Sequence, residues 1–207
     1  MRRPGRTHEV RVGELTLICH VHGRGPLCVV HPGGPGPHGE YLRIPLAERE
    51  LTMAYLEPAG SGWSGTLGTD VEHLHTVIER LGGDPVFVLG HGHGGLVAQS
   101  YAMTHPGRPA GLILYGTTPV AVRAVNGRPV GTARNRPIRT PTLILAGAHD
   151  DVAPPDAAGE LHAGITGSRL AVFERSGHLA HVEEAERFAH LLIEFTRRIS
   201  GPYRAAG

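Results

Sequence analysis

The feature that most constrains the fold of this chain is a series of six short apolar runs that alternate with stretches of helical periodicity. Short continuous apolar runs are typical of buried parallel strands, because helices cover both faces of such a sheet. The alternation predicts a mainly parallel sheet of about eight strands with helices on both faces. The six runs are residues 27–30, 51–56, 85–89, 111–115, 142–146 and 169–173.

The segments between these runs complete an α/β arrangement. Residues 9–21 alternate weakly and predict a hairpin that turns around Gly13, which would add an antiparallel strand at one edge. Asp70 is the expected N-cap of a helix over 70–81. In sheets of this kind the chemistry lies at the carboxyl ends of the strands, where the glycine-rich and histidine-bearing loops fall here. Further helices are expected at residues 41–49, 96–105, 156–162 and 182–199.

The loop after the run at 85–89 is the most informative one. Residues 90–95 read Gly-His-Gly-His-Gly-Gly and lead directly into an expected helix. In the nucleophile elbow G-x-S-x-G a serine lies at the apex of such a turn, whereas the apex here is Gly92. The same residues fit the dinucleotide-binding spacing G-x-G-x-x-G. That interpretation is disfavoured because the motif follows the third buried strand and no acidic residue ends the next strand at Tyr115.

Five loops, in the same order along the chain, resemble those of the α/β-hydrolase superfamily and, most closely, its proline-iminopeptidase-like branch. Residues 90–95 resemble the family's G-H-S-H-G-G turn, and residues 32–36 resemble its H-G-G-P-G oxyanion loop. Residues 57–64 resemble the D-x-R-G-x-G-x-S turn. Residues 147–155 resemble the acid loop G-x-x-D-x-x-x-P, and residues 176–178, Ser-Gly-His, resemble the catalytic-histidine loop.

The resemblance implies a single α/β-hydrolase domain over residues 1–207, with three departures. Gly92 stands where the family has its serine, so the group that would form an acyl-enzyme is missing. The family's helical cap lies between the strands that end at 115 and begin near 142. Only residues 119–140 fill that place here, which predicts a vestigial cap loop and an open site. Ala59 replaces the arginine of the D-x-R-G turn.

The resemblance makes His178 the catalytic base and Asp150 the acid that orients it. Asp151 competes for the second role, but the alignment of Gly147 and Pro154 favours Asp150. An aspartate bonded to the imidazole Nδ1 would fix the tautomer of the base and stabilise its cation.

The same resemblance gives the oxyanion-hole N–H groups to Gly34 and His93, and makes Gly33 and His91 candidates for the pocket. A packing role is the favoured interpretation of His91, because relatives carry the same histidine beside their serine. Other candidates are weaker: Ser61 and Ser64 as substitute nucleophiles, Cys28 as a thiol that we expect to be buried and inert, and the arginines at 123, 128, 134, 136 and 139 as anion ligands.

Charge and hydropathy limit the classes of partner that we expect for this chain. Lys and Arg number 20 against 19 Asp and Glu, so the chain has no general attraction to nucleic acid or to an anionic membrane. No apolar run approaches the ~20 residues of a membrane span, and no signal peptide is recognisable, which favours a cytoplasmic protein. No motif indicates a cofactor, no histidine spacing indicates a metal site, and nothing in the sequence predicts the oligomeric state.

Three functions stay open. The first is a catalyst that needs no serine ester, namely a cyclase, lyase, isomerase or cofactor-free oxygenase that uses His178 and Asp150 on a small molecule. The second is a hydrolase in which His178 activates water directly. The third is a non-catalytic pseudo-hydrolase that binds a small molecule or a protein partner. A retained base, acid and oxyanion loop favour the first two, because a scaffold has no physical need for all three together.

Overall fold

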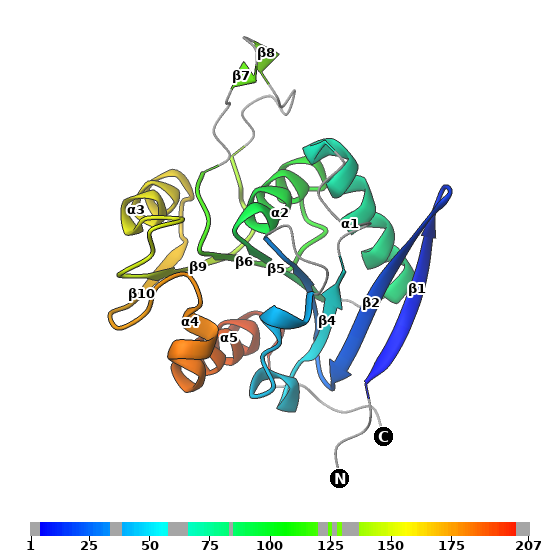
Figure 1. Cartoon of the computed structure of the whole chain (residues 1–207), viewed down its shortest axis with the longest axis horizontal. Helices are drawn as coiled ribbons and strands as arrows, with labels where there is room; N and C mark the ends of the chain where they lie inside the picture. Colours follow the sequence, from blue (N-terminus) through cyan, green and yellow to red (C-terminus); the bar gives the residue numbers. More distant parts are fainter. Residues whose placement is uncertain are drawn as a thin grey trace.

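The structure, a computed structural model, describes residues 5–33, 39–57, 66–82, 85–119, 124–125, 128–129 and 137–201. Within them an eight-stranded sheet has the order β1-β2-β4-β3-β5-β6-β9-β10 (Figure 1). β2 runs antiparallel to both neighbours and every other neighbouring pair is parallel, which confirms the predicted sheet. The strands are β1 (Arg6–Val12), β2 (Leu15–Gly23), β3 (Leu27–His31), β4 (Thr52–Leu56), β5 (Val86–His91), β6 (Gly111–Tyr115), β9 (Thr142–Gly147) and β10 (Arg169–Phe173).

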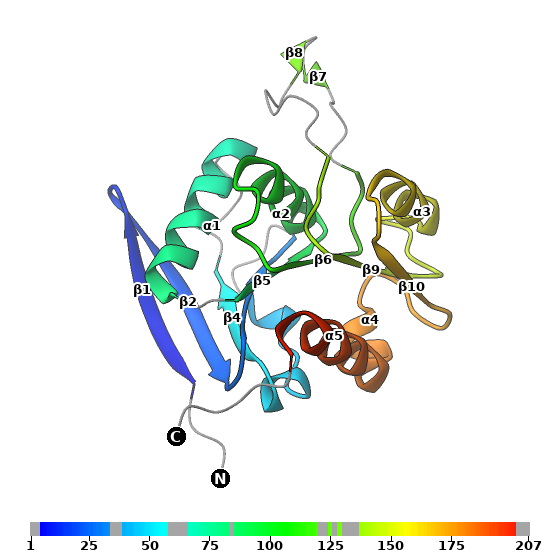
Figure 2. The same ribbon diagram turned by 180° about the vertical axis from the view of Figure 1, so that it is seen from behind.

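Helices cover both faces of this sheet, as Figures 1 and 2 show from opposite sides. Every residue of β3, β5, β6 and β9 is buried, which explains why these strands appear in the sequence as continuous apolar runs. One face packs on α1 (Leu67–Leu81), α2 (His93–Thr104) and α3 (Pro155–Gly164). The other packs mainly on α5 (Ala185–Ser200), with α4 (Ala180–Glu183), η1 (Gly39–Leu42) and η2 (Ala47–Arg49) beside it.

Three predicted helices differ from the observed ones for identifiable reasons. The expected helix over 41–49 is two short 3-10 helices, because Pro45 lacks an N–H and disfavours helical geometry in the residue before it. α1 begins one turn earlier than expected, with Thr66 rather than Asp70 as its N-cap, and the Thr66 hydroxyl accepts the N–H of Thr69 at 3.3 Å. The last predicted helix is interrupted at Glu184, which separates α4 from α5.

The segment between β6 and β9 is only partly described. Its described residues form a two-stranded antiparallel pair, β7 (Ala124–Val125) with β8 (Arg128–Pro129), and no helix. The prediction of a vestigial cap loop over 119–140 falls mostly outside the described residues. In the described part of the chain, no helix is both long enough and apolar enough to span a bilayer.

The packing of α5 yields a testable prediction. Phe188 is fully buried, with its ring centroid 4.8 Å from that of Tyr115 and 5.6 Å from that of Phe173. Phe188→Ala should lower the free energy of unfolding by about 3–5 kcal/mol, because it leaves a cavity under the sheet. Urea denaturation followed by circular dichroism measures this. Leu15→Ala, at the exposed first residue of β2, is the control, and an equal loss of unfolding free energy in both variants would contradict the packing.

Candidate active site

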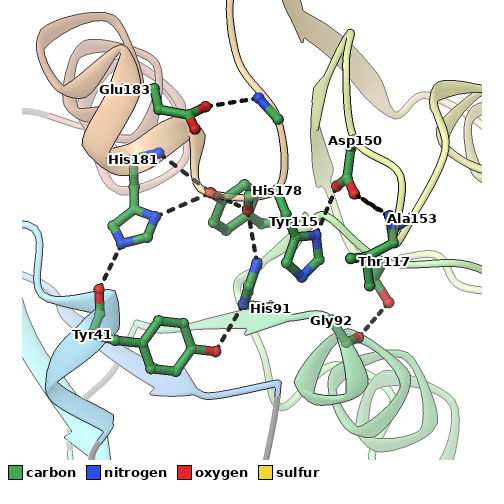
Figure 3. A network of polar contacts seen from close by, with 12 residues as sticks. Tyr41, His91, Gly92, Tyr115, Thr117, Asp150, Ala153, His178, His181 and Glu183 are labelled. Carbon is green, nitrogen blue, oxygen red and sulfur yellow. Dashed lines mark hydrogen bonds and ion pairs between the residues drawn. The ribbon is translucent and has the colours of Figure 1, made fainter.

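The turn at Gly92 joins β5 to α2 at the carboxyl edge of the sheet. Its backbone angles are φ 53° and ψ −118°, a left-handed conformation that reverses the chain within one residue. The Gly92 N–H donates to the carbonyl of Tyr115 at 3.0 Å, and the hydroxyl of Thr117 donates to the Gly92 carbonyl at 2.6 Å. Residues at and just after the end of β6 therefore hold Gly92 through both its N–H and its carbonyl. Figure 3 shows the contact with Thr117.

The glycines of this turn differ in the space around them. A Cβ atom at Gly90 would lie 2.2 Å from the carbonyl oxygen of Gly94, and one at Gly94 would lie 2.2 Å from that of His31. Among the atoms of the described residues, those nearest to a Cβ at Gly92 would be the carbonyl oxygen of Gly33 at 3.3 Å and its Cα at 3.4 Å. The flanking glycines are thus required by backbone contact, whereas the apex has room for a small side chain.

His178 and Asp150 form a short hydrogen bond, with 2.8 Å between the ring Nδ1 and Oδ2. The side chain of Asp150 is fully buried, and its Oδ1 accepts the backbone N–H groups of Val152 and Ala153 at 2.8 Å each. Both carboxylate oxygens therefore have partners, and Nδ1 is committed to the carboxylate. Within the described part of the chain, Asp150 is the one hydrogen-bond partner of a His178 ring nitrogen, so Nε2 is available to a ligand.

The loops that carry this pair are fastened to each other. The N–H of His149 donates to the carbonyl of Ser176 at 3.0 Å. The hydroxyl of Ser176 donates to Glu184, and the N–H of Gly177 donates to Glu183 at 2.7 Å. His178 and Asp150 therefore keep their relative position through contacts between their loops as well as through their own hydrogen bond.

His91 packs directly against His178. Its ring is buried and lies against that of His178, with 4.3 Å between the centroids. Nε2 donates to the backbone carbonyl of His178 at 3.2 Å, so Nδ1 of the neutral ring accepts the Tyr41 hydroxyl at 2.8 Å. Burial, with the nearby His178 as a second cause, lowers the pKa of His91 to about 3. The packing role predicted for His91 thus includes holding the peptide of His178.

Three residues that sequence reasoning missed complete this network (Figure 3). The Tyr115 hydroxyl donates to the carbonyl of His178 at 2.9 Å. His181 lies 3.0 Å from that hydroxyl through Nδ1, and its Nε2 donates to the carbonyl of Tyr41 at 2.7 Å. Burial lowers the pKa of His181 as well. The only sequence signal was the position of these residues next to predicted loops.

The expected oxyanion donors are partly accounted for. Gly34 lies outside the described residues. The N–H of His93 donates to the carbonyl oxygen of Gly33 at 3.4 Å, a long hydrogen bond. The N–H of Gly33 donates to the Tyr41 hydroxyl at 2.9 Å. The side chain of His93 turns to Asp70 on α1, with 3.2 Å between Nε2 and Oδ2.

Of the weaker candidates, the structure describes the side chains of Cys28 and Arg139. Cys28 is fully buried, and burial raises the pKa of its thiol to about 12, which agrees with the expected inert thiol. Arg139 is exposed. The other candidates lie where no side chain is described, namely Ala59, Ser61, Ser64 and the arginines at 123, 128, 134 and 136. Among the described residues no three histidine, cysteine or acidic side chains are grouped as a metal site requires.

Comparison with known proteins agrees with this geometry. Residues 26–135, more than half of the chain, match the family described as alpha/beta hydrolase fold. The chain belongs to this family. A 2-hydroxy-6-oxononadienedioate/2-hydroxy-6-oxononatrienedioate hydrolase of Klebsiella pneumoniae is 25% identical over 268 residues, which cover 90% of this chain and 93% of the relative. A proline iminopeptidase of Saccharolobus solfataricus is 39% identical over 62 residues, 30% of this chain and 20% of the relative.

Solved α/β-hydrolase structures share the fold at low sequence identity. A meta-cleavage product hydrolase from Pseudomonas fluorescens IP01 superimposes with a TM-score of 0.79 at 17% identity, covering 92% of this chain and 97% of the other. An esterase from Exiguobacterium antarcticum gives 0.78 at 21% identity, covering 93% and 100%. These similarities establish that this chain shares the architecture of α/β-hydrolases.

The buried His91 predicts a pH dependence of stability in this α/β-hydrolase domain. With a pKa of about 3 in the folded chain and an ordinary value near 6.5 in the unfolded chain, His91 binds its proton first in the unfolded state. Above about pH 6.5 His91 is neutral in both states and does not lower the stability of the folded chain. As the pH falls from there toward 3, protonation of the unfolded chain lowers the free energy of unfolding by up to ~1.4 kcal/mol per pH unit.

His91→Gln should therefore reduce the slope of unfolding free energy against pH between roughly pH 6 and pH 4. The reduction should correspond to about one proton fewer taken up on unfolding. Urea unfolding at a series of pH values measures the slope in both proteins. The buried His31, whose pKa burial lowers to about 4, titrates in the same direction and remains in both. Identical slopes would show that His91 carries a proton in the folded chain.

Proposed function

We propose that this protein is an enzyme that acts on a small molecule by general-base catalysis, with His178 as the base and Asp150 as its orienting acid. No acyl-enzyme forms at Gly92. The observation that carries the proposal is the paired His178 and buried Asp150, with every oxygen of the acid satisfied, beside a turn whose apex residue has no nucleophile.

The position of Gly92 supports its assignment as the site of the missing nucleophile. It is the apex of a strand-to-helix turn, with a positive φ and with glycines required on either side. His178 reaches this turn through Gly116, where an added Cβ would lie 3.2 Å from the His178 ring and 3.3 Å from the ring of His91, the residue before Gly92. The base is therefore close to the peptide where a serine would otherwise stand.

Direct attack by water is the reaction that this arrangement and the relatives favour most. The relatives in the comparisons are named as hydrolases, and a base next to an apex without a side chain can take a proton from water. The N–H of His93, at the start of α2, would stabilise negative charge on the attacked oxygen. Cyclase, lyase, isomerase and cofactor-free oxygenase reactions need the same proton transfer and the same donor.

A short cap also belongs to this proposal. The alignment with the Klebsiella relative runs over 268 residues, which a chain of 207 can span only with gaps, so the relative has residues that this chain lacks. We place the shortening in residues 119–140, within one domain over residues 1–207. An open site above the sheet would admit substrates without a lid movement, and it leaves Gly33 and His91 as lining residues.

Labelling tests the missing nucleophile. A fluorophosphonate probe should leave the natural protein unmodified, because no serine Oγ stands beside His178. Gly92→Ser should restore labelling, and Gly92→Ser with His178→Ala should lose it again. Mass spectrometry of the labelled peptides measures the site. Labelling of the natural protein at Ser61 or Ser64 would overturn the assignment.

Variants of the base test the catalytic role. With a panel of nitrophenyl esters and lactones, His178→Ala should lower kcat/KM by ~10²–10⁴-fold, since a positioned base supplies about that much. Asp150→Asn should lower it less, and His91→Ala less still. Arg139→Ala, on an exposed surface, is the matched control. Equal rates in His178→Ala and the natural protein would leave a non-catalytic pseudo-hydrolase that binds a small molecule or a protein partner.

A further inference from the structure

A cavity of about 880 Å³ lies at the amino edge of the sheet, where Pro26 directly precedes β3 and Leu51 directly precedes β4. Its other wall is the second half of α5, and Figures 1 and 2 show α5 beside the segment that leads into β4. The candidate active site lies at the opposite, carboxyl edge, and none of its residues is among the described residues that line this cavity. The volume is within the range of about 300–1,000 Å³ that is typical of small-molecule sites.

The lining of this cavity combines apolar surface with positive charge. Pro26, Leu51 and Ile193 contribute apolar side chains. The described lining also includes four arginines and two glutamates, an excess of two positive charges. These residues are Arg24, Arg49, Arg197 and Arg198, with Glu50 and Glu194. Such a lining is complementary to a ligand that has an apolar body and an anionic head group.

Both glutamates of the lining already have arginine partners. Glu50 pairs with Arg197, which joins the segment before β4 to α5. Glu194 pairs with Arg169 of β10 at 3.0 Å, and Arg169 is outside the described lining. The two carboxylates therefore leave most of the positive charge of the cavity without an opposite charge in contact with it.

Arg24 and Arg49 lie on segments separate from α5. Arg24 directly follows β2, and Arg49 is the last residue of η2. Both are exposed, and within the described part of the chain neither takes part in an ion pair or a side-chain hydrogen bond. A guanidinium group can bind a carboxylate through two parallel N–H donors. The N–H groups of these two arginines are therefore available to a ligand carboxylate.

Ser200, the last residue of α5, adds an unpaired hydroxyl to the lining. Its Oγ is buried and is the one such side-chain oxygen or nitrogen of the described residues that has no hydrogen-bond partner. A buried hydroxyl without a partner is unfavourable and is uncommon in folded proteins. Because Ser200 lines the cavity, rotation about its Cα–Cβ bond would let the O–H reach an acceptor oxygen of a bound ligand.

We propose that this cavity is a second binding site of the protein and that its ligand is an amphiphilic carboxylate, the anion of a carboxylic acid with an alkyl chain. The carboxylate binds the guanidinium groups of Arg24 and Arg49, and the chain packs on Leu51 and Ile193. The proposal does not depend on the proposed function, because it uses neither His178 nor any other residue of the candidate active site.

Isothermal titration calorimetry with octanoate tests this site. Butyrate should bind more weakly than octanoate, by up to about fourfold for each CH₂ group that it lacks. Octan-1-ol has the chain without the charge and should bind at least ~10-fold more weakly, because it makes no charge-assisted hydrogen bond. Sodium chloride at about 0.5 M should weaken the binding of octanoate, since the arginines are exposed.

Removal of the two arginines tests the head-group contact. The double variant Arg24→Gln with Arg49→Gln should bind octanoate about 10–100-fold more weakly. The matched control is Arg11→Gln with Arg139→Gln, which changes the net charge equally at exposed positions outside the described lining. This control should bind octanoate as the natural protein does, and circular dichroism checks that both variants are folded.

Glu50→Gln provides a variant with the opposite expectation. It releases Arg197 from its ion pair and adds a third available guanidinium to the cavity. Octanoate should therefore bind about two- to fivefold more tightly, the range expected for one exposed ion pair. Partial unfolding would weaken binding, so a gain of affinity supports the site itself.

Several results would overturn the proposal. These are equal affinities for octanoate and octan-1-ol, unchanged binding in the double arginine variant, weaker binding in Glu50→Gln, and no binding at about 10 mM octanoate. Binding that is lost in His178→Ala but kept in the double arginine variant would place octanoate at the candidate active site, which also excludes the proposed site. None of these results bears on whether His178 acts as a base.

Discussion

The close approach of backbone segments around the turn after β5 is the constraint on which the site depends. Carbonyl oxygens lie 2.0 to 2.2 Å from the positions that Cβ atoms of Gly33, Gly90 and Gly94 would take. These contacts bring the end of β3, the end of β5 and the start of α2 together through main-chain atoms. The location of the site therefore follows from how closely the main chains of the strands and the helix pack. The side chains of the site project from this fixed backbone.

The sequence predicts this fold well where the signal is local. Strands buried on both faces must be continuously apolar, and Asp150 is held by N–H groups two and three residues along the chain, so a loop motif contains the information. The contact between Tyr41 and His91 joins residues 50 positions apart, and no periodicity encodes it. The expected helix over 41–49 failed because Pro45 outweighed the apolar spacing.

The layer beneath His178 shows what such distant contacts contribute. The carbonyl of His178 accepts hydrogen bonds from His91 and Tyr115, so the peptide of His178 is held in place as well as its ring. Burial keeps the neighbouring imidazoles neutral, which matters because a charged ring stacked on His178 would oppose its protonation. In the mechanism that we propose, His178 gains and releases a proton beside rings that do not compete with it for that proton.

The backbone angle of Gly92 has an evolutionary consequence. At φ 53° any residue with a Cβ carries a steric cost of about 1–2 kcal/mol, which a serine nucleophile must bear continuously. A lineage that replaces this serine by glycine regains that stability at once, and the reserve can offset destabilising changes elsewhere. Once those changes accumulate, restoring the serine would lower the stability of the fold further than it tolerates. In any lineage with such a turn, replacement of a serine by glycine would therefore be easier to acquire than to reverse.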